Sequence, residues 1–208
     1  MYCILVTGIP AAGKSTLAGF LSESLHLPLI SKDQIKEIMY DDIGFRSRAE
    51  KVRLGIAGMN IMYYTAGQLM KVKQPFILEN NFENVSRDGL MKLLDQYDYK
   101  AITITLTGDY RSIYQRFLQR NASPERHRGH VVNDCYPEEN RGKEENGSKN
   151  RGTEVSYESF VNGIVNRGMD KFKANGPQIL VDTTDFGKVD LYRLLDEIER
   201  CKRRFFTQ

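Results

Sequence analysis

A glycine-rich segment near the start of the chain has the residues needed to bind a polyphosphate. Gly8–Ser15 has the sequence G-I-P-A-A-G-K-S, which matches the pattern G-x-x-x-x-G-K-[ST] at every fixed position. In this pattern the glycines let backbone N–H groups face the phosphates, the lysine reaches the β- and γ-phosphates, and the hydroxyl binds Mg²⁺. We therefore expect Lys14 to act in catalysis and Ser15 to bind the metal. The residues expected to bind Mg-ATP are Gly8, Ile9, Pro10, Ala11, Ala12, Gly13, Lys14, Ser15 and Thr16.

The residues on either side predict the elements that such a loop requires. Tyr2–Thr7 is apolar and rich in β-branched residues, which predicts a buried strand. Leu17, Leu21 and Leu25 recur at helical spacing, which predicts a helix directly after the loop. The N-terminus of that helix would add a partial positive charge beside the phosphates.

Asp33 follows the second predicted strand, where ligands of parallel sheets gather. A phosphotransferase needs a carboxylate that accepts the proton of the attacking hydroxyl or orients it, and Asp33 is the strongest candidate. The alternative is an N-cap of the next helix, a role that aspartate favours. Lys36 could bind an acidic acceptor, although a single lysine on a helix surface is more often solvated.

Three polar residues follow the third predicted strand. Glu79 could hold Mg²⁺ through water or orient the acceptor, and Asn80 and Asn81 offer amide groups to a polar substrate. The alternative is a turn at the end of the strand, where asparagine is common.

Arginines are concentrated after the fourth predicted strand. Arg116 and Arg120 lie four residues apart on one helix face, and Arg126 follows in a polar stretch. Guanidinium groups stabilise the charge of a transferring phosphoryl group, and their planes can stack on adenine. We expect Arg120 and Arg126 to be catalytic; a solvated basic face is the alternative. His127 and His130 have a spacing that a metal could use, but no other residue completes a ligand set.

Strands and helices alternate along the chain. Further strands are predicted at 27–30, 75–79, 100–106 and 178–182. Helices are predicted at about 34–41, 47–72 and 86–94, then after 109, near 157 and after 189. This alternation predicts an α/β fold in which helices cover both faces of a parallel sheet.

The composition changes after Arg120. Residues 121–153 are polar with almost no apolar periodicity, and 133–152 are especially poor in apolar residues. We therefore expect one domain over 1–208, with a lid or mobile insertion at about 121–155.

Composition limits the remaining classes of protein. A chain of 208 residues with 40% hydrophobic and 27% charged residues suits a soluble α/β domain. No apolar run approaches the roughly 20 residues that span a bilayer. The three cysteines give neither a disulfide framework nor a metal-binding spacing. Nothing resembles a signal peptide, so we expect a cytoplasmic protein. The net charge of +3 is too small to indicate a nucleic-acid partner.

These motifs together resemble a group of small phosphate-loop kinases. The resemblance rests on Gly8–Thr16, on Ser31-Lys32-Asp33, on Glu79–Phe82 and on Arg116, Arg120 and Arg126-His127. The group includes polynucleotide kinase, chloramphenicol phosphotransferase and the zeta-toxin kinases. The resemblance covers roughly residues 2–130 and, more loosely, the last predicted strand and helix.

The resemblance implies a three-layer αβα fold with a five-stranded parallel sheet in the order 2-3-1-4-5. It implies that Asp33 activates the acceptor, that Arg116 stacks near adenine and that Arg120 contacts the phosphates. The stretch at Thr183, Thr184 and Asp185 would then lie near the adenine. Two departures stand out: strand three ends in Glu79 rather than aspartate, and the polar segment is longer than a simple lid.

We therefore expect a phosphotransferase that moves the γ-phosphate of Mg-ATP to a hydroxyl group. A small-molecule acceptor is favoured over a nucleic-acid end, because no predicted helix carries an extended basic face with aromatic residues. A nucleoside monophosphate kinase is less favoured, because Arg46, Arg48 and Arg53 are the only candidates for its arginine pair. The absence of an N-K-x-D sequence favours ATP over GTP. The alternative class is an ATP-dependent regulatory switch or ATPase that acts through a protein or RNA partner.

Overall fold

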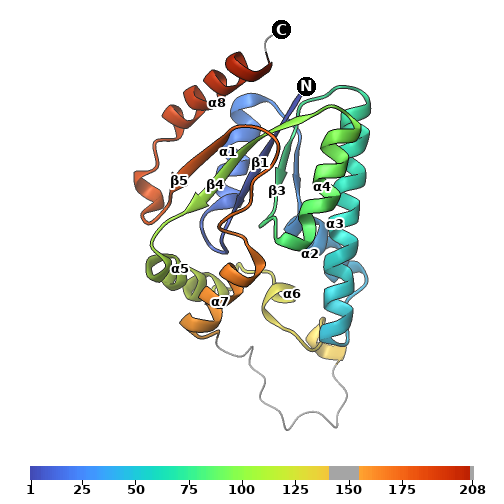
Figure 1. The fold of residues 1–208 in the computed structure, drawn as a ribbon. Helices are drawn as coiled ribbons and strands as arrows, with labels where there is room; N and C mark the ends of the chain where they lie inside the picture. The colour runs from blue at the N-terminus through green and yellow to red at the C-terminus, as the bar shows by residue number, and fades with distance from the viewer. Residues whose placement is uncertain (141–154, 207–208) are drawn as a thin grey trace.

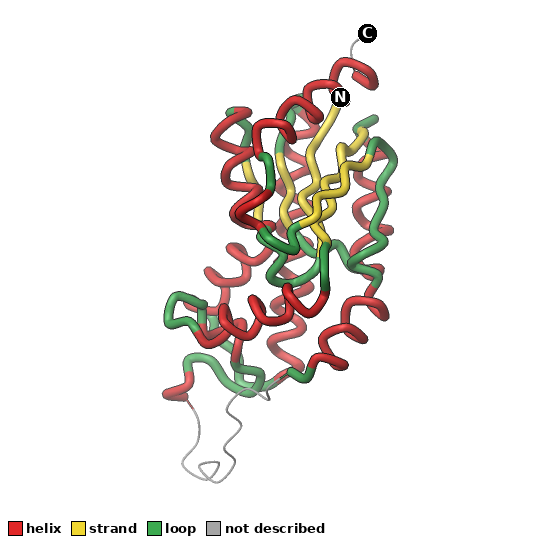
Figure 2. The backbone as a smooth tube through the Cα atoms, turned by 90° about the vertical axis from the view of Figure 1, so that its left-hand side faces the viewer, coloured by secondary structure: helices red, strands yellow, loops and turns green. Residues whose placement is uncertain are grey.

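The computed structural model describes residues 1–140 and 155–206 as five parallel strands with helices on both sides (Figures 1 and 2). The strands are β1 (Tyr2–Gly8), β2 (Leu29–Ser31), β3 (Ile77–Glu79), β4 (Lys100–Thr107) and β5 (Gln178–Asp182). The longer helices are α1 (Lys14–Leu25), α2 (Lys32–Asp42), α3 (Arg48–Lys71), α4 (Asn84–Gln96), α5 (Tyr110–Ala122), α7 (Tyr157–Arg167) and α8 (Leu191–Phe206). The short helices are α6 (Arg128–Val131), η1 (Glu138–Asn140) and η3 (Phe186–Lys188).

The strand order is β2-β3-β1-β4-β5, so the predicted fold class and order are confirmed. In register, Val6 of β1 lies opposite Glu79 of β3, and Gly8 lies opposite Leu106 of β4. Ser31 of β2 lies opposite Glu79 from the other side. The three predicted sites after strands one, two and three therefore meet at one edge of the sheet.

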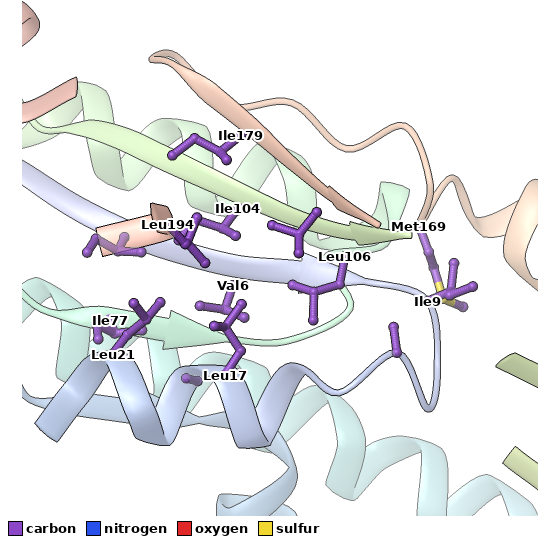
Figure 3. Packing of buried hydrophobic residues seen from close by; sticks show 14 of the residues in the cluster. Val6, Ile9, Leu17, Leu21, Ile77, Ile104, Leu106, Met169, Ile179 and Leu194 are labelled. Atoms are coloured by element: carbon purple, nitrogen blue, oxygen red, sulfur yellow. The ribbon is translucent and has the colours of Figure 1, made fainter. Parts of the chain in front are cut away.

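Each face of the sheet has its own buried cluster, because successive side chains of a strand point to opposite faces. Ile4 and Val6 belong to the cluster that packs on α1, α7 and α8, while Cys3 and Leu5 pack against α3 and α4. Figure 3 shows part of the first cluster, in which Ile9 from the glycine-rich loop is also buried. The buried side chain of Ile9 thus anchors the loop in the core.

Serine and aspartate side chains begin several helices, as their capping preference predicts. Asp109 accepts a hydrogen bond from Ser112 N at the start of α5. The alternative N-cap role of Asp33 is wrong, because Ser31 caps α2 and Asp33 lies in its first turn. Its carboxylate is therefore available for other contacts.

The polar stretch after α5 contains more packed structure than its sequence indicated. Val132 and Cys135 are buried, and Val132 packs in a small cluster with Tyr40 and Phe45 from the α2–α3 region. Phe45 and Tyr136 also exchange backbone hydrogen bonds of 2.8 Å in both directions. Part of the predicted insertion is therefore fixed to α2 and α3. Its remainder, 141–154, lies outside the described residues, and the expected division into one domain stays a prediction.

Candidate active site

The loop between β1 and α1 has a backbone that few residues other than glycine adopt. Gly8, Ala11 and Gly13 have φ angles of 132°, 63° and 92°. A Cβ atom on Gly8 would lie 2.1 Å from the carbonyl oxygen of Leu106, and one on Gly13 would lie 2.4 Å from the ring of Phe186. The loop is therefore pressed against β4 and η3, which leaves its backbone open on the remaining side as a cradle for phosphate.

Lys14 is the buried cation of this loop. Its side chain is 8% exposed, and Nζ donates a hydrogen bond of 2.8 Å to the carbonyl oxygen of Ile9. Burial lowers the pKa of Lys14 to about 8, although the carboxylates of Glu79 and Asp33 oppose this shift. An incoming phosphate would favour the charged ammonium. Ser15 and Thr16 are exposed at the start of α1, where their hydroxyl groups can reach a ligand or metal.

Glu79 and Ser31 form a buried pair at the ends of β3 and β2. The Ser31 hydroxyl donates a hydrogen bond of 2.6 Å to Glu79 Oε2. Burial raises the pKa of Glu79, although Lys14 and the Ser31 hydroxyl act in the opposite direction. Close by, the Thr7 hydroxyl donates to the Asn81 carbonyl oxygen at 2.8 Å. The polar groups expected after β3 thus lie directly beside the loop.

Asp33 occupies the first turn of α2 and faces two cations. Lys36 Nζ lies 3.0 Å from Asp33 Oδ1, and an Arg126 Nη atom lies 4.0 Å from Oδ2. Desolvation raises the pKa of Asp33, but Lys36 and Arg126 lower it more and hold it well below its usual range. Asp33 is therefore ionised at neutral pH, and its side chain is still 46% exposed to the cleft. Lys36 is paired and only 18% exposed, so it is not the solvated lysine of the alternative interpretation.

Three arginines bring unpaired donors to the same region. Within the described residues, the Nε atoms of Arg116, Arg120 and Arg126 are buried without a hydrogen-bond partner. Burial and the neighbouring Arg126 lower the pKa of Arg120 to about 10, which leaves it charged at neutral pH. Buried unpaired guanidinium donors are costly unless an anion satisfies them. A polyphosphate on the loop would supply such an anion.

Arg116 contacts the second segment that the resemblance placed near adenine. Its guanidinium donates a hydrogen bond to the carbonyl oxygen of Thr183, which follows β5. The Thr183 backbone N–H and hydroxyl both bond to the Thr107 carbonyl oxygen, at 2.7 and 2.9 Å. The two segments that the resemblance placed near adenine are therefore in contact.

These side chains line one cleft of about 1250 Å³, which is large enough for a nucleotide and a second small ligand. From the loop, the lining includes Pro10, Ala11, Gly13, Lys14, Ser15 and Thr16. From the other predicted positions, it includes Asp33, Lys36, Glu79, Asn81, Arg116, Arg120 and Arg126. Gly8, Ile9, Ala12 and Asn80 are outside this lining; Ile9 and Ala12 are core residues, and Asn80 N donates to the Val6 carbonyl oxygen.

The cleft fits a Mg-nucleotide by its own chemistry. The loop, whose close packing on β4 and η3 requires glycine at positions 8 and 13, suits phosphate, and the unpaired arginine donors suit its charge. The exposed Ser15 hydroxyl and the carboxylates of Asp33 and Glu79 are oxygen donors, which Mg²⁺ prefers. Among the described residues, no group of three His, Cys, Asp or Glu side chains is arranged to hold a metal by itself.

The sequence did not reveal the side-chain pairs that join the α6 region to α2 beside the cleft. His130 Nε2 lies 2.8 Å from Glu37 Oε1, and His127 Nε2 lies 3.0 Å from Asp41 Oδ1. Both histidines thus connect the α6 region to α2 rather than to each other through a metal. The only sequence signal for this pairing is that two acidic residues one helical turn apart, Glu37 and Asp41, and two histidines three positions apart, His127 and His130, lie on different segments.

Lys51 of α3 is a second residue that the sequence did not reveal. Its side chain is 7% exposed, and Nζ donates to the carbonyl oxygens of His130 and Val132 and to Asn133 Oδ1. Arg48, one turn before Lys51, also donates to Asn133 Oδ1 at 2.9 Å and lines the cleft. Of the three arginines considered for a nucleotide acceptor, Arg48 alone belongs to this described lining.

Fold and site together define a phosphate-loop protein with an αβα architecture. The family comparison is more specific: the sequence model of a family described as AAA domain, AAA_33, matches residues 3–135. Because this match covers more than half of the chain, the protein belongs to that family. None of the curated proteins compared with the chain matches it.

Solved structures agree with this assignment. A protein of Chloroflexus aurantiacus J-10-fl, described as a "putative kinase", is 26% identical with a TM-score of 0.73, and the alignment covers 96% of this chain and 97% of the other. A sugar kinase from Janibacter sp. HTCC2649 is 10% identical with a TM-score of 0.53, over 96% and 92% of the two chains. A gluconokinase from Sinorhizobium meliloti 1021 is 13% identical with a TM-score of 0.51, over 95% of both. The family match and the fold confirm the predicted resemblance to small phosphate-loop kinases.

Across residues 1–140 and 155–206, no helix combines the length and the apolar composition that a bilayer crossing needs.

Proposed function

We propose that the protein transfers the γ-phosphate of Mg-ATP to a hydroxyl group of a small molecule. The observation that carries this proposal is the position of Asp33: an ionised carboxylate lines the same cleft as the phosphate-binding loop and three arginines. When bound, Mg-ATP supplies the phosphoryl group. The sugar kinase and the gluconokinase that share the fold support a small-molecule acceptor.

The loop and the arginines handle negative charge in this proposal. Backbone N–H groups of the loop residues that line the cleft, Ala11 and Gly13–Thr16, bind the phosphates, and Lys14 turns from the Ile9 carbonyl oxygen towards them. Arg120 and Arg126 stabilise the charge that develops on the transferring group, while Arg116 holds the nucleoside end beside Thr183. Ser15, with Glu79 or Asp33, would hold Mg²⁺.

In this proposal Asp33 orients the acceptor hydroxyl and does not act as a strong general base. The pKa of Asp33 is held well below its usual range by Lys36 and Arg126, against desolvation, so Asp33 is a weak base. Phosphoryl transfer passes through a loose transition state that needs positioning and charge stabilisation more than a strong base. A hydrogen bond from the hydroxyl to the Asp33 carboxylate would supply that positioning.

The test measures transfer of label from γ-labelled ATP to pooled sugars, polyols, hydroxy acids, nucleosides and 5′-hydroxyl oligonucleotides. We expect label in a small-molecule pool and a loss of kcat of roughly 10²-fold in Asp33→Asn, because a misplacement of the acceptor by about 1 Å costs on that order. Lys14→Ala should lose nucleotide binding as well. Asp42→Asn, at the exposed end of the same helix, is the matched control and should keep full activity.

Two results would contradict the proposal. Label in the oligonucleotide pool alone would show that the acceptor is a nucleic-acid end. Nucleotide binding without transfer to any pool, unchanged by Asp33→Asn, would favour the ATP-dependent switch instead.

A further inference from the structure

The cleft has more positive charge than a nucleotide site at its loop end requires. Among the described residues that line it, seven are lysine or arginine and three are aspartate or glutamate. Lys14 of α1, Arg116 and Arg120 of α5, and Arg126 after α5 serve the nucleotide and its transferring group in the proposed function. The remaining basic side chains lie on or beside α2, α3 and α7, at the end that would receive the acceptor.

The acidic groups at the acceptor end already have partners. Asp33 pairs with Lys36 at 3.0 Å, and Glu37 accepts a hydrogen bond from His130 at 2.8 Å. Arg126 lies 3.9–4.0 Å from both carboxylates, a separation at which charge is only partly compensated. Arg167, which also lines the cleft, is paired with Glu83 at 3.1 Å.

Arg48 is the cation that these pairings leave over. Within the described residues, its guanidinium group donates a hydrogen bond of 2.9 Å to the neutral amide oxygen of Asn133. A guanidinium group has five N–H donors in a planar fork, which suits the two oxygens of an acid group. Arg48 therefore has both the charge and the free donors to bind an anion at the mouth of the cleft.

The electrostatic surroundings of Lys51 agree with this concentration of cations along the cleft. Burial lowers the pKa of the Lys51 ammonium, and Arg48, Lys36 and Arg126 each lower it further. All three charges are thus within electrostatic reach of the same buried group. An anion that entered this region would relieve their mutual repulsion.

We propose that the phosphate acceptor carries an acid group, a carboxylate or a phosphate ester, that binds at Arg48 while its hydroxyl faces Asp33; this inference rests on the proposed function. A neutral polyol would leave the excess positive charge of this wall uncompensated. Preference for an acid over the matching alcohol is therefore built into the acceptor end of the cleft.

The experiment compares acids with their neutral counterparts by calorimetry. The loop is first filled with the Mg complex of a non-hydrolysable ATP analogue, in a buffer free of sulfate and phosphate. The probes are D-glycerate and glycerol 3-phosphate against glycerol, and D-gluconate against D-glucitol. We expect at least one acid to bind tenfold or more tightly than its alcohol, and the stronger of glycerate and glycerol 3-phosphate identifies the acid group.

Variants assign the preference to Arg48. Arg48→Gln should weaken binding of the preferred acid by roughly ten- to hundredfold, the range of a hydrogen bond to a charged group. Arg48→Lys, which keeps the positive charge, should retain part of the affinity for the preferred acid. Arg46→Gln, exposed two residues earlier and outside the described cleft lining, should change nothing. The inference is overturned when no acid binds better than its alcohol, or when Arg48→Gln leaves the preference intact.

The same samples separate this inference from the proposed function. Label transfer from ATP to neutral alcohols, without preference for acids, would overturn the inference and support the proposed function. Arg48-dependent binding of acids without transfer of label to any of them would overturn the phosphotransfer proposal for these acids and leave a binding site for anions.

Discussion

The ionisation of Lys14 should make nucleotide affinity depend on pH. Burial lowers the pKa of its free ammonium to about 8, and a bound polyphosphate would favour the charged form and raise that pKa. Nucleotide binding then takes up a proton above pH 8, so affinity should be constant below pH 8 and fall above it. The fall should approach tenfold per pH unit.

Fluorescence anisotropy with a labelled ATP analogue between pH 6.5 and 9.5 measures this dependence. Lys14→Arg is the control, because a guanidinium group stays charged over the whole range and its profile should be flat. Superimposable profiles for the two proteins would show that Lys14 does not titrate in the free site.

At the scale of elements, α3 supports the site through its contact with α2. A Cβ atom on Gly58 of α3 would lie 3.1 Å from Met39 Cε and 3.2 Å from Lys36 Cγ, whereas one on Gly55 would meet nothing within 4 Å. The close approach at Gly58 allows α3 to pack directly against the turn of α2 that contains Lys36, the ion-pair partner of Asp33.

Alanine substitutions on α3 should therefore have different effects one turn apart. Gly55→Ala should raise the free energy of unfolding by about 0.5–1 kcal/mol, because alanine is the better helix former. Gly58→Ala should lose that gain to crowding and lower kcat by displacing Lys36. Urea unfolding and label transfer measure both; equal stabilisation with equal activity would show that the α2–α3 contact does not tune the site.

At the scale of the whole molecule, hydrogen bonds join α3 to the polar stretch after α5. Lys51 contacts residues that lie about 80 positions later in the chain. These bonds, with the His130–Glu37 pair, hold the segment that follows Arg126 against α2 and α3.

Removing Lys51 should loosen that segment. Lys51→Met leaves the carbonyl oxygens of His130 and Val132 without their donor, which should lower the free energy of unfolding by about 1–3 kcal/mol. Hydrogen exchange over residues 126–138 should become faster at the same time. Lys71→Met, exposed at the end of α3, is the control. A stability and an exchange pattern equal to those of the control would contradict the role of Lys51.

The sequence by itself determined the loop, the strands and the order of polar residues after them. A phosphate loop is a local pattern, and apolar periodicity is set by residues a few positions apart, so Gly8–Ser15 and the strand runs could be recognised directly. The rule that ligands gather at the carboxyl ends of parallel strands then placed Asp33 and Glu79 near the loop. The cleft brings both of these residues together with Lys14.

Only the tertiary structure decided which side chains from distant segments meet. Phe186 against Gly13, Ser31 against Glu79 and Lys51 against the 130–133 backbone each depend on packing between elements that sequence spacing does not relate. The polar stretch was the hardest part to predict, because a few apolar residues such as Val132 fix it through contacts with α2 and α3 rather than through a periodic face of its own. The charge of the cleft arises in the same way, since Arg48 and Arg126 lie far apart in the chain and line one cleft only in the folded protein.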